Sequence, residues 1–224
     1  AGVQLLSLFQ AEPRLLQAIV RALGLAPRLA AALARQPAVL DALIDPRFLT
    51  PVSADPPEAF DGAMAAAVAA ADGFEQALDL ARRAHRELAF RIGFQALDDL
   101  IAPADAQRAF TALADASVRA LLPAAIAEVE RLHGALPGAV AVAAWGKHGG
   151  GELAVGSDLD LMLLYDPTSD ESVGPRALPA ETFFAKVAQR LVTALSAPTA
   201  EGALYEVDLQ LRPSGKAGPI AVRI

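Results

Sequence analysis

Residues 141–167 read AVAAWGKHGGGELAVGSDLDLMLLYDP, an apolar run that turns at glycines and resumes after two closely spaced aspartates. The first run has the small and β-branched residues of a short buried strand, and the second run begins polar and ends apolar. Because side chains alternate along a strand, Asp158 and Asp160 share one face, about 7 Å apart along the backbone. The stretch predicts a strand, a turn and a second strand with two carboxylates at its mouth.

The chain before this stretch has the spacing of helices. Residues 13–24, PRLLQAIVRALG, carry proline where a first turn tolerates it and glycine where a left-handed cap is favoured. The four prolines of residues 45–57 predict a connector. Apolar stripes then recur at three- and four-residue steps from Phe74 to Ile92 and from Phe110 to Val129, where Pro123 is expected to bend or split the helix. These segments together predict a helical bundle.

Beyond the second strand, a further helix and a further strand are expected. The helix has one apolar face, formed by Phe184, Val187, Ala188, Leu191 and Leu195. Residues 202–215, GALYEVDLQLRPSG, alternate between apolar positions and a polar face that includes Asp208 and Glu206. We therefore predict an α+β protein, with a helical region over residues 1–135 and a small mixed sheet with packed helices over 136–224. Because residue 224 falls within another apparent strand, we expect the chain to be a fragment.

Composition excludes several classes of function. The 224 residues are 54% hydrophobic and 20% charged, which suits one large or two small globular domains. A net charge of −7 argues against general affinity for nucleic-acid backbone. The absence of cysteine excludes disulfides and cysteine-based zinc sites. The alanine-rich run at 63–71 is too short for a membrane helix and no signal peptide is evident, so we expect a soluble, cytoplasmic protein without nucleic-acid or membrane partners.

The carboxylates favour a metal site. Asp158 and Asp160 repel each other on one face, and a divalent cation between them would make the pairing favourable. Mg²⁺ suits such a pair, because it takes hard oxygen ligands and often bridges carboxylates, water and substrate phosphates. If the strand of Asp208 lies beside the first, the three carboxylates could hold two metal ions, one activating a hydroxyl and one orienting a nucleotide. A solvated turn is the alternative for an isolated Asp-x-Asp pair.

The glycine turn favours a phosphate site at the same edge. Gly146 and Lys147 end the first strand, and glycines let backbone N–H groups approach an anion, with a helix start adding its positive dipole end. The spacing of a Walker A loop is absent. His148 lies between glycines, where a nucleotide contact is one interpretation, whereas His85 on a helical stripe is interpreted as a partly buried structural residue.

The motifs resemble those of one superfamily. The Gly-Lys turn, the Asp-x-Asp pair and the later aspartate resemble the DNA polymerase β-like nucleotidyltransferases. Residues 145–166, WGKHGGGELAVGSDLDLMLLYD, and 196–218, SAPTAEGALYEVDLQLRPSGKAG, are similar to the glutamine synthetase adenylyltransferase family. LYEVD and LRPSG resemble its C-terminal, adenylylating unit, and residues 33–51, LARQPAVLDALIDPRFLTP, resemble the segment that precedes that unit.

This resemblance implies a reaction and its residues. AMP would pass from ATP to a tyrosine hydroxyl of glutamine synthetase, with Mg²⁺ as cofactor and pyrophosphate as product. Asp158, Asp160 and Asp208 would be the catalytic metal ligands, with Asp208 helping to deprotonate the tyrosine. The positions matching the triphosphate site are Gly146, Lys147, Gly156, Ser157 and Arg212. The resemblance also implies a longer full protein, for which the nitrogen-signalling protein PII is a candidate partner.

Two positions depart from the family pattern, and other functions stay open. His148 stands where leucine is common, and Gln210 stands where arginine is common, which weakens any expectation of a cation there. Arg212 has a surface role as its alternative. Besides adenylylation, the chain could be the adenylyl-removing unit, which releases AMP from the modified tyrosine as ADP by phosphorolysis. It could also be a catalytically silent docking module.

Overall fold

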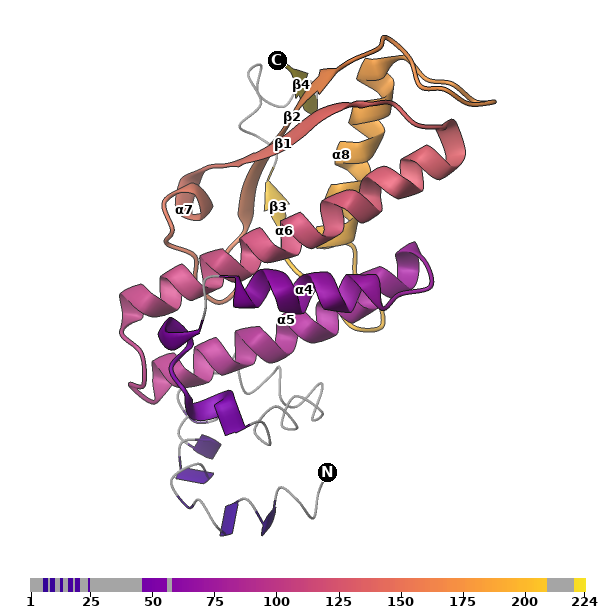
Figure 1. Ribbon diagram of the computed structural model, residues 1–224. Coiled ribbons are helices and arrows are strands. Elements are labelled where there is room, and N and C mark those ends of the chain that lie inside the picture. The colour runs from indigo at the N-terminus through magenta and orange to yellow at the C-terminus, as the bar shows by residue number, and fades with distance from the viewer. Residues whose placement is uncertain are drawn as a thin grey trace.

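A computed structural model (Figure 1) describes residues 46–55, 58–208 and 220–224, together with scattered positions between residues 6 and 24. The predictions for residues 25–45 and for Arg212 lie outside these residues. In the described part the element order is η2 (Pro46–Leu49), η3 (Val52–Ala54), α4 (Ala59–Ala69), α5 (Phe74–Leu97), α6 (Pro103–His133), β1 (Gly138–Ala144), α7 (Gly146–Gly149), β2 (Leu159–Pro167), α8 (Ala180–Ser196), β3 (Val207–Asp208) and β4 (Ala221–Arg223). The protein is thus of mixed α+β class.

The helices α4, α5 and α6 pack against one another, as the stripes predict. In the described part of the proline-rich connector, residues 46–55, the regular structure is limited to the two single-turn 3₁₀ helices η2 and η3. On α6 the predicted stripe is buried at Leu113, Leu121 and Val129. The helix begins with Pro103 in its first turn, where a missing N–H has no consequence. It ends before Gly134, whose φ of +78° suits glycine and turns the chain toward the sheet.

Pro123 does not split α6, contrary to one of the two predicted outcomes. The helix runs unbroken for 31 residues with the proline in its interior. A proline there removes one backbone hydrogen bond and crowds the preceding turn, at a cost of about 3 kcal/mol. The neighbouring Leu121 and Ala125 are fully buried, so packing on the core on both sides of the proline stabilises the continuous helix.

The same helix is the one described helix long and apolar enough to cross a membrane by length and composition. Core helices pass this test as well, and half of its most apolar window is buried inside the protein. In this structure α4, α5 and α8 all pack against α6. The helix is therefore the central packing element of the described fold.

The sheet is built around β2. β1 pairs with β2 antiparallel, from Gly138 opposite Pro167 to Ala144 opposite Leu161. β3 and β4 both pair with β2 in parallel, β3 near its start and β4 further along. The predicted burial of β1 is wrong, because within the described residues it pairs with β2 alone and leaves Gly138, Ala139 and Ala141 exposed at the sheet edge.

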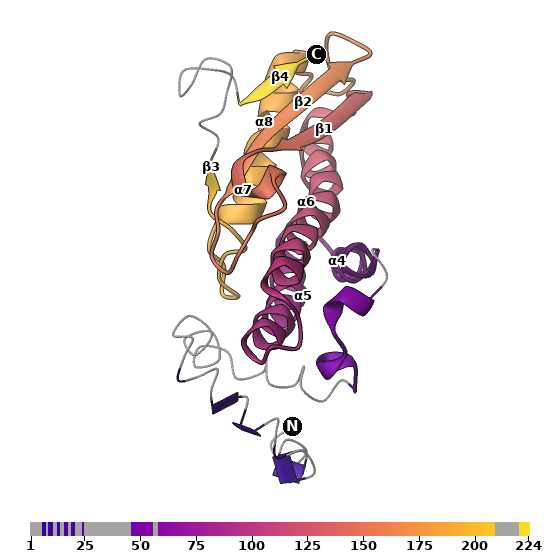
Figure 2. The same cartoon turned by 90° about the vertical axis from the view of Figure 1, so that its left-hand side faces the viewer.

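The helix α8 covers one face of the sheet, and α6 lies beside α8 (Figure 2). All five residues of the predicted apolar face of α8 are buried. Tyr165 of β2 stacks on Phe184, with ring centroids 4.4 Å apart. The buried residues of the helices and the sheet form one continuous core. Whether residues 1–135 and 136–224 are separate domains stays a prediction.

Candidate functional site

The strand pairing places two of the predicted carboxylates side by side. Asp160 of β2 is directly opposite Asp208 of β3 in the parallel register. The pair is held by the Leu159 N–H, which donates to the Glu206 carbonyl at 2.9 Å. Neighbouring strands lie about 4.8 Å apart, so the two aspartates start from adjacent backbone positions. The sequence-based condition that the strand of Asp208 lies next to the Asp-x-Asp strand is confirmed.

The alternation of β2 separates its core side chains from its acidic ones. Leu159, Leu161 and Leu163 are buried on the side covered by α8. Asp160 is half-buried on the other side, and Asp158 is exposed just before the strand begins. The leucines therefore anchor the strand in the core while the carboxylates stay accessible. This arrangement answers how two charges can stand at the mouth of an apolar strand.

Gly146 joins the turn to the carboxylate strand. Its φ is +54°, a conformation that side chains rarely adopt. A Cβ at this position would lie well inside contact distance of Asp160 Oδ2 and 3.3 Å from Asp160 Cγ. The preceding Trp145 donates its backbone N–H to the Asp160 carbonyl at 3.0 Å. The glycine is thus required by both its backbone conformation and its approach to the carboxylate.

The turn after Gly146 is anchored by His148. The helix α7 has only four residues, so it supplies little of the dipole expected from a following helix. Lys147 is exposed, whereas His148 is buried, with 4% of its surface accessible. The His148 Nε2 atom lies 2.9 Å from Asp115 Oδ1 on α6. The histidine therefore ties the turn to the helical bundle, and a nucleotide contact by it stays a prediction.

A polar network continues behind that anchor. Arg119 forms ion pairs with Asp61 of α4 at 3.0 Å and with Asp115 at 3.7 Å. Its hydrogen bond with Asp61 raises the pKa of the Arg119 guanidinium, so the cation is retained. The network thereby links α4, α6 and α7 behind the glycine turn.

The turn before Asp158 contains the other two predicted phosphate-site residues. Gly156 has a φ of +75°, as the third position of a glycine-bearing turn requires. Ser157 donates its N–H to the Ala154 carbonyl at 3.0 Å and accepts the Ala154 N–H at 3.1 Å through its hydroxyl. In this structure both residues therefore shape the entry to β2. Their contact with a triphosphate stays a prediction.

The three aspartates have the chemistry of a metal centre. Asp158, Asp160 and Asp208 supply the hard oxygen ligands that Mg²⁺ prefers, and the register brings the last two together. Among the described residues, however, no three acidic, histidine or cysteine side chains are gathered closely enough to hold a metal ion. The backbone register thus brings two of the aspartates together, but the side chains are not arranged around one metal position. Binding would require rotation of these carboxylates toward one point.

Comparison with known proteins gives a family for this chain. The sequence matches glutamate-ammonia ligase adenylyltransferase over residues 16–224. The chain belongs to the glutamate-ammonia ligase adenylyltransferase family. It is 49% identical to a bifunctional glutamine synthetase adenylyltransferase/adenylyl-removing enzyme of Caulobacter vibrioides, over 99% of this chain and 22% of that protein. Proteins of the same name from Mesorhizobium japonicum and Brucella suis are 44% and 45% identical over the whole chain and 23% of their own lengths.

The chain thus spans less than a quarter of the length of these adenylyltransferase relatives. The family membership confirms the resemblance of residues 145–166 and 196–218 to glutamine synthetase adenylyltransferases. The relatives' shared name covers two activities, adenylyl transfer and adenylyl removal.

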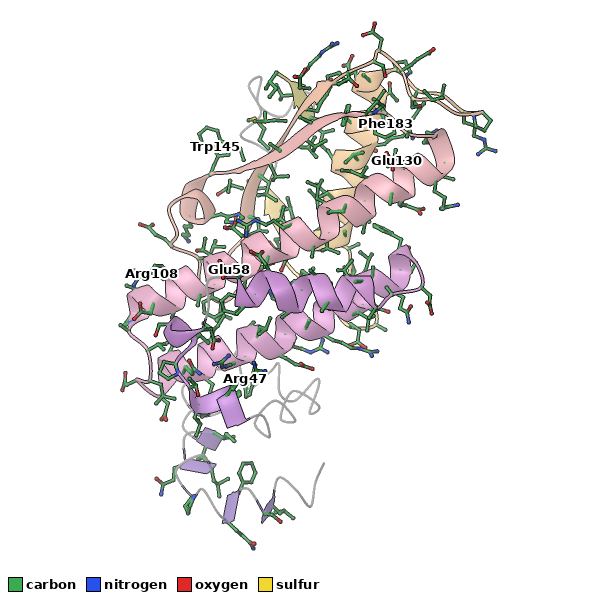
Figure 3. All side chains as sticks on the ribbon, in the orientation of Figure 1. Arg47, Glu58, Arg108, Glu130, Trp145 and Phe183 are labelled. Carbon is green, nitrogen blue, oxygen red and sulfur yellow. The ribbon has the colours of Figure 1, made fainter. Side chains whose placement is uncertain are left out.

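Sequence reasoning missed two features around this adenylyltransferase-family site. Trp145 projects outward where β1 ends, with 48% of its surface exposed (Figure 3). The loop from α8 to β3 is held by polar side chains of α5, among them the buried Arg82, whereas His85 in the same contact was expected as a partly buried structural residue and is half-buried. Only the exposed tryptophan had a signal in the sequence, as an aromatic residue directly before the Gly-Lys turn.

Proposed function

We propose that this chain is the adenylylating unit of a glutamine synthetase adenylyltransferase and contains a polymerase β-like nucleotidyltransferase core. It would transfer AMP from ATP to a tyrosine hydroxyl of glutamine synthetase. The observation that carries the proposal is the pairing of Asp160 with Asp208, with Gly146 packed on the Asp160 carboxylate. The names of the relatives support glutamine synthetase as the protein substrate. Cytoplasmic location and the nitrogen-signalling protein PII as a partner of the full-length protein belong to the same proposal.

The residues present fit defined roles in that reaction. Asp158, Asp160 and Asp208 would hold Mg²⁺, which supplies neutralisation of the phosphate charges when it is bound. Lys147 is exposed and follows directly after Gly146, which approaches the Asp160 carboxylate, so we assign it to contact phosphate oxygens. Gly146, Gly156, Ser157 and Arg212 complete the proposed triphosphate site.

The proposed reaction must transfer one proton as well as the adenylyl group. The tyrosine oxygen forms a bond to the α-phosphorus as the bond between that phosphorus and the oxygen bridging to the β-phosphate breaks. Pyrophosphate leaves with the bonding electrons, and the phenolic proton passes to Asp208 or to solvent. A carboxylate within hydrogen-bond reach of the attacking hydroxyl can accept its proton as a general base.

The adenylyl-removing reaction is the second candidate, because the relatives' name includes it. In that reaction inorganic phosphate attacks the phosphorus of the tyrosine-bound AMP and releases ADP. The LYEVD and LRPSG segments, which resemble the adenylylating unit, favour the first reaction. A silent docking module is the third candidate, and the retention of all three aspartates counts against it.

The test uses the protein at its natural length with labelled ATP, Mg²⁺ and unmodified glutamine synthetase. We expect label on a tyrosine of glutamine synthetase, and a loss of about 10²-fold or more in Asp160→Asn or Asp158→Asn. Asp166→Asn is the matched control, since Asp166 is an exposed aspartate on the same face of β2. Equal labelling by wild type and Asp160→Asn would reject the proposal.

The alternatives are separated in the same preparation. Adenylylated glutamine synthetase is incubated with inorganic phosphate, and ADP is measured. Release of ADP that depends on Asp160, without labelling of the unmodified protein, would assign the removing reaction to this chain. Binding of glutamine synthetase without either reaction would assign the docking function.

A further inference from the structure

We propose that helix α5 positions the strand that carries Asp208, with Arg82 as the main positioning residue and Tyr205 as its second anchor. The inference rests on the proposed function for the role of Asp208 itself. None of the α5 residues involved is placed among the reacting groups. They act on the site through the loop that joins α8 to β3, which runs back to α5 in Figure 1.

Arg82 is enclosed, and its hydrogen bonds to the described residues all go to backbone carbonyls. It has 2% of its surface exposed. Its Nε donates to the Gly202 carbonyl at 2.7 Å, and its Nη2 donates to the carbonyls of Ala194 at 3.0 Å and Ala197 at 2.6 Å. The last carbonyls of a helix lack partners within that helix, so one guanidinium satisfies the end of α8 and the following turn together. Burial lowers the pKa of Arg82, but an arginine remains charged.

The turn that Arg82 holds is tied to α5 by further side chains. Thr199 and Gly202 close it with reciprocal backbone hydrogen bonds of 2.9 and 3.0 Å. The Thr199 hydroxyl donates to Asp79 at 2.6 Å. Glu201 pairs with Arg83 at 2.7 Å and Arg86 at 3.0 Å, which holds the pKa of the Glu201 carboxyl below its usual value. One face of α5 therefore contacts this short turn at several points.

Tyr205 provides the second anchor, three residues before Asp208. Its hydroxyl lies 2.8 Å from His85 Nε2, and the two rings meet edge to face with centroids 4.9 Å apart. Burial raises the pKa of the Tyr205 phenol and lowers that of His85 to about 4, so both groups are neutral near pH 7. The backbone N–H of Tyr205 also donates to the Leu195 carbonyl at 3.0 Å.

The two anchors fix where β3 starts. From Tyr205 the chain continues to Glu206, whose carbonyl accepts the Leu159 N–H of β2 at 2.9 Å. Strand geometry leaves about 3.3 Å per residue, so an anchored Tyr205 defines the register that sets Asp208 opposite Asp160. A shift by one residue would turn the Asp208 side chain to the other face. The bonds of Arg82 to three carbonyls specify backbone position, which an apolar residue of similar size could not do.

The first test measures structure without any nucleotide. Backbone amide hydrogen exchange is compared in wild type, Arg82→Met, Tyr205→Phe and the control Arg108→Met. Arg108 is exposed at the start of α6, away from this loop (Figure 3). We expect exchange over residues 197–208 to rise by about tenfold or more in Arg82→Met and less in Tyr205→Phe, with β1 and α4 unchanged. Unchanged exchange over 197–208, or a uniform rise throughout the chain, would overturn the proposal.

The second test measures the site. In the full-length protein, AMP transfer is followed against Mg²⁺ concentration for the same variants. Positioning predicts that Tyr205→Phe and Arg82→Met raise the Mg²⁺ concentration needed for half-maximal rate while KM for glutamine synthetase stays unchanged. An unchanged Mg²⁺ requirement in both variants counts against positioning. If wild type transfers no AMP, the proposed function fails, whereas the exchange experiment still decides whether α5 holds the loop.

Discussion

Substitution of Gly146 by alanine tests whether the glycine turn and the carboxylate strand form one site. The residue has a φ of +54°, and an alanine Cβ there would lie 3.3 Å from Asp160 Cγ and closer still to Oδ2. Two separate penalties follow from this geometry. One belongs to the backbone conformation and the other to the displaced carboxylate.

The backbone penalty affects the melting temperature, whereas the displacement of the carboxylate affects the rate of AMP transfer. A side chain in the left-handed region costs about 1–2 kcal/mol, which lowers the melting temperature of a chain of this size by about 2–4 °C per kcal/mol. To restore ordinary contact the Asp160 carboxylate must move by about 1 Å. A misplacement of that size at a catalytic group reduces the rate by about 10²-fold. We therefore expect Gly146→Ala to be modestly destabilised and strongly impaired in AMP transfer.

Gly151→Ala is the matched control. Gly151 has a φ of +74°, but a Cβ there meets no atom within 4 Å. Both variants thus have the backbone penalty, and only Gly146→Ala displaces Asp160. Thermal unfolding and the AMP-transfer rate are measured for both. Equal rates in the two variants would refute the conclusion that Gly146 is needed for its approach to Asp160.

Three further predictions concern the core and its titration. Burial lowers the pKa of His85 to about 4 in the folded chain, against 6.5 in the unfolded chain. The free energy of unfolding therefore falls by up to about 3 kcal/mol as the pH drops from 6.5 to 4. Urea unfolding at several pH values should show this decrease in wild type, and His85→Gln should lack it. Phe183 is fully buried, and Phe183→Ala should lower the free energy of unfolding by about 3–5 kcal/mol in the same assay. Pro123→Ala restores a missing hydrogen bond in α6 and should raise the melting temperature, whereas a lower value would show that the proline is accommodated without strain.

The elements that the sequence predicted well are those whose burial repeats with the period of the element. The face of α8 around Phe184 and Leu191 is buried as its spacing predicts, and β2 alternates from Leu159 onward. A period of 3.6 or 2 identifies such elements because one side of each packs on the core. Of the strand predicted over residues 202–215, the described part contains only Val207–Asp208, both half-buried, and its pairing with β2 sets Asp208 opposite Asp160.

The wrong expectations arose where tertiary contacts overrode the local pattern. β1 has the residues of a buried strand, yet its edge position leaves several of them exposed. Pro123 has the chemistry of a helix breaker, yet packing on both sides keeps α6 continuous. In each case a residue type was interpreted without the neighbours that the fold supplies.

The contacts between α5 and the loop that leads to Asp208 could not be predicted from any pattern in the sequence. Arg82 lies 112 to 120 residues from the carbonyls that it binds, and carbonyls are the same for every residue type. The charges of residues 82–87, RRAHRE, are typical of a solvated helix face, and only the structure separates the buried Arg82 from the exposed Arg83. Because a buried cation needs partners, loss of the loop would leave the Arg82 guanidinium buried without these three carbonyls. The helical bundle is therefore part of the proposed site, although none of its side chains is placed among the reacting groups.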